Sequence, residues 1–126
     1  MFRQTIILIL CSLVLLSMVA CSSNGAASDA PNTVHMSDTQ FALPSITIKK
    51  GESINLTSDT FTPHTIANGT WDGETAKPAT EPGAPRVENI QIGGNSSTSI
   101  GPFNTAGTFK LYCTIHSGMK LEVIVK

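Results

Sequence analysis

From residue 33 onward, the chain alternates short β-prone runs with turn residues, and no stretch keeps an apolar period of 3.6. Residues 53–57 show the pattern most clearly, because polar and apolar side chains alternate there as in a strand with one buried face. The strands we expect include a short run around His35 and cover residues 41–48, 53–57, 64–66, 89–92, 96–100, 108–113 and 120–125. The pattern predicts strands throughout and no helix.

The segments between these runs have the composition of turns and loops. Residues 49–52 form a tight turn around Gly51, and residues 93–95 form another. Residues 68–86 contain three glycines and three prolines, which predicts a long surface loop. Together the runs and turns indicate an all-β fold, a Greek-key β-sandwich of seven or eight strands.

One strand places a cysteine in the predicted core. Alternation over residues 108–113 puts Phe109, Leu111 and Cys113 on one face, with Lys110 and Tyr112 on the other. Cys113 therefore closes a buried row of side chains. The last strand, residues 120–125, has a matching apolar face.

The N-terminus has the composition of a targeting segment. Arg3 is followed by an apolar stretch over residues 6–16 that is too short to span a bilayer comfortably. Small residues precede Cys21, and this order resembles a bacterial lipobox. The resemblance implies a lipoprotein signal peptide over residues 1–20, with Cys21 as the lipidated first residue of the mature chain.

A flexible tether is expected to follow the signal. Residues 21–32 are rich in Ser, Ala, Asn and Gly, and such segments bury little surface. Residues 33–126 then form a single domain of ordinary size. These boundaries predict a domain in the cell envelope, on the extracytoplasmic side, held to a membrane by the lipid anchor at Cys21.

The charge balance excludes one class of partner. The chain has eight basic and nine acidic residues, and removal of the signal takes away one basic residue, Arg3. A near-neutral domain without a basic patch gives no case for nucleic acid binding.

Cysteine usage points to a metal. Cys11 leaves with the signal and Cys21 carries the lipid, so Cys113 has no partner for a disulfide within the chain. An unpaired thiol outside the cytoplasm oxidises unless it is buried, lipidated or bound to a metal. Cys113 alone would usually be an inert buried thiol, so its neighbours decide the interpretation.

Cys113, His116 and Met119 lie on one short loop between the last two predicted strands. A thiolate, an imidazole and a thioether suit copper, and a blue-copper site has two histidines, one cysteine and a weak axial methionine. The second histidine must be His35 or His64. His64 is favoured because Pro63 can fix its direction, whereas His35 has the position of an edge residue.

Several motifs together resemble the cupredoxin family of type 1 blue copper proteins. They are residues 41–48 with the turn that follows, Thr62 to Thr65, Gly107 to Phe109, and Tyr112 to His116 with Met119. The spacing of the ligand loop is similar to the plastocyanin and amicyanin type. One departure stands out: Thr65 occupies the position where many members have an asparagine that ties the ligand loops together. We therefore hypothesise that Thr65 and Thr114 link the loops through hydroxyl and backbone groups.

The resemblance implies one type 1 copper ion, Cu(I) or Cu(II), held by His64, Cys113, His116 and Met119. It further implies single-electron transfer between redox partner proteins that dock transiently near His116. Ile115, Ser117 and Gly118 would surround this port. Phe61 or Trp71 would extend it or serve as ordinary packing. A monomer is expected.

Three other functions are alternatives to electron transfer. A copper storage, sensing or delivery module would need the same ligands. A metal-free sandwich for adhesion or assembly would need none of them. An enzyme is disfavoured, because a thiol nucleophile needs an oriented third group and a cleft, a binuclear copper centre needs a second loop cysteine, and multicopper oxidases need more than three histidines.

Overall fold

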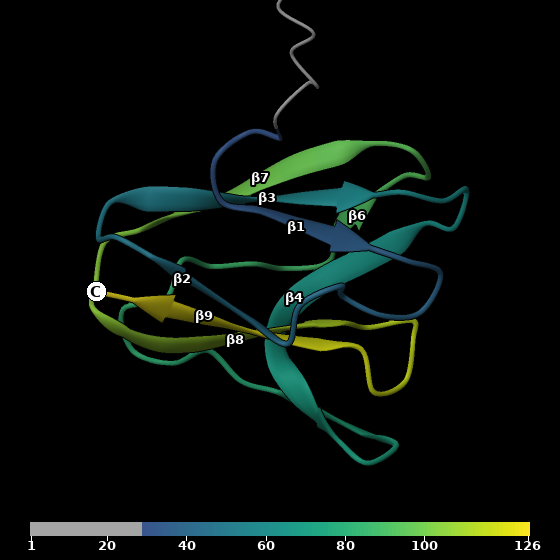
Figure 1. Cartoon of the computed structure of the whole chain (residues 1–126). Coiled ribbons are helices and arrows are strands. Elements are labelled where there is room, and N and C mark those ends of the chain that lie inside the picture. Colours follow the sequence, from purple (N-terminus) through teal and green to yellow (C-terminus); the bar gives the residue numbers. More distant parts are fainter. Residues whose placement is uncertain (1–28) are drawn as a thin grey trace, which may run out of the picture.

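The computed structural model describes residues 29–126 as two β-sheets packed face to face (Figure 1). The strands are β1 (Thr33–Met36), β2 (Ser45–Ile48), β3 (Glu52–Ser58), β4 (His64–Asp72), β5 (Thr75–Pro78), β6 (Ile90–Ile92), β7 (Ser97–Phe103), β8 (Gly107–Cys113) and β9 (Lys120–Val125). The prediction of an all-β sandwich without helices is confirmed for these residues. They contain no helix with the length and apolar character to cross a membrane.

The smaller sheet has the order β1-β3-β7, and the larger has the order β2-β9-β8-β4-β5, with β6 also paired to β4. β1 is parallel to β3 and β2 is parallel to β9, while β4, β8 and β9 are antiparallel. The chain crosses between the sheets before and after β2, from β3 to β4, and before and after β7. The ligand-bearing strands β4 and β8 therefore become neighbours although they are far apart in sequence.

The core lies between the sheets and is built by alternation. β3 buries Ile54 and Leu56, and β8 buries Phe109, Leu111 and Cys113, as its alternation predicts. The neighbouring strand β9 pairs with β8 over the whole length of β9, and its apolar side chains extend the same buried face. Cys113 is fully buried at the end of this layer.

The structure corrects the strand count and one loop. There are nine strands in the described residues rather than seven or eight, because the segment 68–86 is not all loop. Its first residues continue β4, and β5 returns antiparallel with Asp72 opposite Thr75. Gly73 has φ 59° in the two-residue turn between them, a conformation that glycine adopts without strain. The Asp-Gly pair at 72–73 was the hairpin signal in this segment.

Two further expectations need adjusting. The strand expected over residues 41–48 is reduced to β2, since Phe41 only bridges Met36 and Pro44 precedes the strand. A proline has no backbone N–H to donate to the sheet, which explains why β2 begins only after Pro44.

Tyr112 faces away from the core as predicted, yet it is buried, because the β4–β5 hairpin covers the outer face of β8.

Candidate metal centre

His64 is the first residue of β4, and the loop before it is held by several hydrogen bonds. The Ser58 hydroxyl donates to the carbonyl oxygens of Thr60 and Thr62, at 3.2 and 3.1 Å. The Thr62 hydroxyl donates to an Asp38 carboxylate oxygen at 2.6 Å. These bonds and the exposed Pro63 fix the direction in which the chain enters β4.

The same loop rests on a glycine of the β6–β7 turn. A Cβ on Gly94 would lie 2.5 Å from the Phe61 carbonyl carbon and 2.6 Å from the Phe61 Cα. The Asn95 amide also donates to the Thr60 carbonyl at 2.8 Å. Only glycine at position 94 lets the two backbones approach this closely.

Cys113, His116 and Met119 come from the end of β8 and the loop that leads to β9. The Cys113 amide donates to the Met119 carbonyl at 3.0 Å, and the Met119 amide donates to the His116 carbonyl at 3.2 Å. These bonds close the loop into a compact turn whose ends both lie on strands. Cys113 and Met119 are fully buried, whereas His116 is half-buried.

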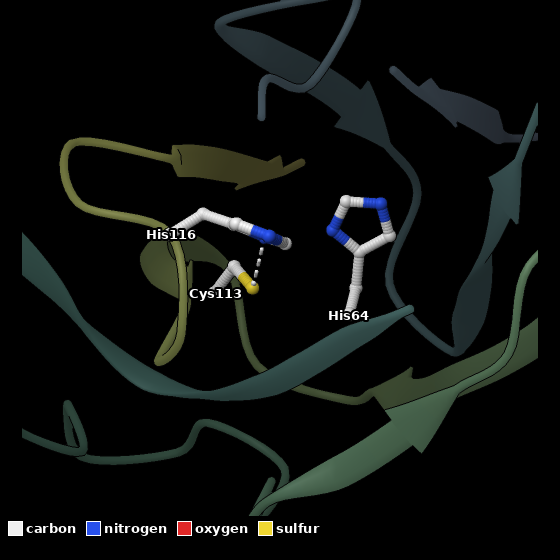
Figure 2. A group of neighbouring side chains, drawn as sticks. All are labelled: His64, Cys113 and His116. Atoms are coloured by element: carbon white, nitrogen blue, oxygen red, sulfur yellow. Dashed lines mark hydrogen bonds between the residues drawn. The ribbon is translucent and has the colours of Figure 1, made fainter. Parts of the chain in front are cut away.

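The two ligand segments converge (Figure 2). One nitrogen from each of His64 and His116 and the Cys113 Sγ all lie within 4.8 Å of one another. Cys113 Sγ is 3.3 Å from His116 Nδ1, and the two imidazole centroids are 5.0 Å apart. Donor atoms on one metal ion lie about 2.0–2.3 Å from it, so such spacings suit a single shared ion.

His64 has the protonation state that a metal ligand needs. It is buried, and neither ring nitrogen has a hydrogen-bond partner among the described residues. Burial first, and then the nearby His116, lower the pKa of His64, while the Ser37 backbone and the Asp38 carboxylate oppose this shift. The Ser37 backbone lies near the His64 ring but forms no hydrogen bond with either ring nitrogen. His64 is therefore a neutral imidazole with an unused lone pair facing the group.

Backbone atoms join the two ligand segments directly. The Thr114 amide donates to the Thr65 carbonyl at 2.8 Å, one residue beyond each ligand. This bond confirms the backbone half of the hypothesised Thr65–Thr114 link.

The third histidine lies elsewhere. His35 Nδ1 is 2.7 Å from Asp59 Oδ1, and His35 Nε2 is 3.0 Å from Asp29 Oδ2. Both ring nitrogens are thus occupied by carboxylates at the edge of the smaller sheet. The sequence-based choice of His64 over His35 agrees with this placement.

Sequence reasoning missed the role of one contact. Trp71 of the hairpin donates its indole N–H to the Cys113 carbonyl at 2.9 Å. Trp71 was considered only as part of the docking surface or as ordinary packing, because the hairpin that carries it had been interpreted as loop, and its hydrogen bond to Cys113 was not predicted. Phe61, by contrast, is 91% exposed.

The lipid anchor falls outside the described residues. Cys21, the signal peptide over residues 1–20 and most of the tether over residues 21–32 precede Asp29, where the description begins. Their roles stay predictions.

Comparisons with known proteins give the family and the fold of the described domain. A family model described as copper binding proteins of the plastocyanin/azurin family matches residues 29–126. A search of curated proteins found no match. The solved structure of amicyanin from Paracoccus versutus (Thiobacillus versutus) is 24% identical, with a TM-score of 0.58, over 80% of this chain and 87% of that chain.

Two other solved structures give the same result. A reduced Cu(I) form of an amicyanin variant at pH 4 is 18% identical with a TM-score of 0.57, covering 80% of this chain and 87% of that one. An oxidised amicyanin variant is 20% identical with a TM-score of 0.58 and the same coverage. At these identities the likeness establishes a shared fold.

Proposed function

The chain belongs to the plastocyanin/azurin family of copper-binding proteins, and from this premise we propose that it is a blue copper protein that carries single electrons. The observation that carries the proposal is the group of His64, Cys113 and His116, with donor atoms within 4.8 Å of one another. A buried neutral imidazole without a partner has a cost in free energy that a bound metal would remove.

The proposed ligands of the single type 1 copper ion are His64, Cys113, His116 and Met119. Two imidazoles and a thiolate in one group form the donor set preferred by a blue-copper centre, with a methionine as the weak axial partner. Met119 supports this role because it is buried and its backbone closes the loop that holds Cys113.

The contribution of the chain is rigidity around the metal. When bound, copper supplies the one-electron Cu(I)/Cu(II) couple. His64 and Cys113 lie at strand ends, His116 and Met119 lie in the short loop between β8 and β9, and the Thr65–Thr114 bond and the closed turn hold these residues at fixed separations. Burial of Cys113, Met119 and His64 excludes water from three of the four side chains. Fixed ligands lower the rearrangement that accompanies each electron transfer.

We propose that partners dock at the surface around His116. His116 is the least buried of the four residues, and its neighbour Ile115 is 55% exposed. Phe61 and Pro63 lie in the loop that leads into His64 and are also exposed. A small apolar patch suits a transient redox encounter, because such interfaces bury little area and release quickly.

Electrochemistry tests electron transfer against copper delivery. We expect the copper-loaded protein to show reversible one-electron voltammetry and to retain its metal when mixed with a copper-free acceptor. Irreversible voltammetry with rapid loss of copper to the acceptor would favour storage or delivery and contradict the carrier proposal.

The membrane tether is a separate proposal. Cys21 precedes Asp29 by eight residues, so an extended tether would reach at most about 28 Å from the anchor. The domain would then work close to the membrane surface. Expression with Cys21→Ala should move the protein from the membrane fraction to the soluble fraction. Unchanged partition of the variant would refute the anchor.

A further inference from the structure

We propose that Trp71 is a positioning residue for the copper-binding cysteine, acting through the backbone carbonyl of Cys113. This inference rests on the proposed function, because it assigns Cys113 as a ligand. Its basis is the 2.9 Å hydrogen bond from Trp71 Nε1 to that carbonyl oxygen.

The peptide group after Cys113 is held at both of its polar atoms. Its carbonyl accepts from Trp71, and its N–H, on Thr114, donates to the Thr65 carbonyl at 2.8 Å. Both partners belong to β4, the strand that begins with His64. β4 therefore fixes the plane of the peptide that joins Cys113 to the ligand loop, besides supplying a ligand itself.

The hairpin that presents Trp71 is shaped for this contact. Gly69 has φ 135°, and a Cβ there would lie 2.8 Å from Tyr112 Cε1 and 2.9 Å from the Pro78 Cα. This conformation lets β4 bend past β8, and the far end of β4 leaves the body of the sheet (Figure 1). The Trp71 ring then meets the Tyr112 ring edge to face, with centroids 5.8 Å apart.

Burial and a second hydrogen bond at Trp71 favour this contact over hydration of the Cys113 carbonyl. Trp71 is half-buried and Tyr112 is buried, so water competes weakly for the Cys113 carbonyl. Lys120 Nζ also donates to the Trp71 carbonyl at 3.4 Å, which ties the hairpin to the start of β9. Trp71 is thus held from two sides while it donates.

The bond should affect the metal as well as the fold. A donor on the Cys113 carbonyl withdraws electron density from the residue whose thiolate binds copper. Loss of the donor makes the thiolate a better electron donor, which favours Cu(II) over Cu(I). Groups that orient a ligand from outside the coordination sphere commonly tune affinity and redox potential.

The test exploits the presence of a single tryptophan in the chain. ¹⁵N-labelled tryptophan gives one indole resonance, and in the metal-free protein we expect its N–H to exchange with solvent many times more slowly than in the unfolded chain. Exchange as fast as in the unfolded chain would overturn the proposal without any reference to copper.

Trp71→Phe keeps an aromatic ring against Tyr112 and removes the donor. We expect a lower reduction potential, an altered copper hyperfine splitting in the electron paramagnetic resonance spectrum, and severalfold faster loss of copper to a chelator. Replacing Trp71 with benzothienylalanine, which keeps the shape and lacks the N–H, should lower the potential in the same direction even if Trp71→Phe folds poorly.

Tyr112→Phe is the matched control, because it keeps the edge-to-face ring pair and the indole donor. Its potential should stay at the wild-type value. Equal shifts in Tyr112→Phe and Trp71→Phe, or no shift in either Trp71 variant, would refute the role of the N–H. Failure of the wild-type protein to bind copper would instead refute the proposed function, so the two failures are distinct.

Discussion

Among single residues, His64 differs most from an ordinary core side chain. It is buried, and within residues 29–126 neither of its ring nitrogens has a hydrogen-bond partner, whereas buried polar groups are almost always hydrogen-bonded. Such a group destabilises the metal-free protein by about 1–3 kcal/mol. The metal-free fold is therefore destabilised at the position where the metal would bind, which is typical of functional sites.

This cost leads to a prediction about His64→Leu. The variant should lose copper binding and yet be more stable than the wild type when both are metal-free, by about 1–2 kcal/mol. Urea unfolding of the metal-free proteins, followed by circular dichroism, measures the difference. A metal-free variant that is clearly less stable would show that the ring makes favourable contacts in solution.

The pKa of His35 shifts in the opposite direction from that of His64. Hydrogen bonds to Asp59 first and Asp29 second raise the pKa of His35 above its ordinary value. A raised pKa means that this contribution to stability is complete below about pH 6.5 and disappears as pH rises through the folded-state pKa. The pair is partly exposed, so the effect is about 0.2–1 kcal/mol.

We therefore expect the stability difference between wild type and His35→Ala to be larger at pH 5.5 than at pH 8.5. Chemical denaturation at both pH values measures it, and Asp59→Asn should reproduce the trend by removing the main partner. A difference that grows with pH would contradict the assigned protonation.

At the scale of elements, the loop from β3 to β4 and the turn from β6 to β7 support each other. Gly94 has no room for a Cβ against the Phe61 backbone, whereas the nearest atom to a Cβ on Gly93 would be the Ser96 Oγ, at 3.4 Å. Overpacking at such a position costs about 1–3 kcal/mol. The loop that must move is the one that sets the direction of His64.

Gly94→Ala should therefore lower the free energy of unfolding by about 1–3 kcal/mol and weaken copper binding. Gly93→Ala is the control and should leave copper binding near the wild-type value. Denaturant titration and competition with a chelator give both quantities. Equal effects of the two substitutions would mean that the Phe61 contact does not position His64.

The sequence and the structure agree on elements where one physical pattern dominates. The alternation of polar and apolar residues with a period of two predicted β3, β8 and β9, and it placed Cys113 on the buried face. It failed for the β4–β5 hairpin, whose β5 residues are all exposed and show no alternation of burial. Only the turn chemistry of Asp72-Gly73 indicated that hairpin, and the bend at Gly69 depends on tertiary contacts.

At the scale of the whole molecule, the sheet topology brings together site residues that local sequence patterns identified one by one. β4 and β8 are neighbouring strands in which Ile66 pairs with Cys113. His64 therefore lies only two residues along β4 from the residue opposite the cysteine. Such a pairing cannot be derived from spacing along the chain, because β5, β6 and β7 intervene. Pro63 and the resemblance to a known family predicted that His64 joins Cys113 at one site, but neither predicted the pairing of the two strands or the contact of Trp71 with Cys113.

The most direct test of the central claim is the visible absorption spectrum of the purified protein with Cu(II). We predict an intense blue colour from thiolate-to-copper charge transfer, abolished in Cys113→Ser and retained in His35→Ala, whose histidine lies outside the group. A colourless copper-loaded wild type, or a Cys113→Ser variant as blue as the wild type, would contradict the assignment.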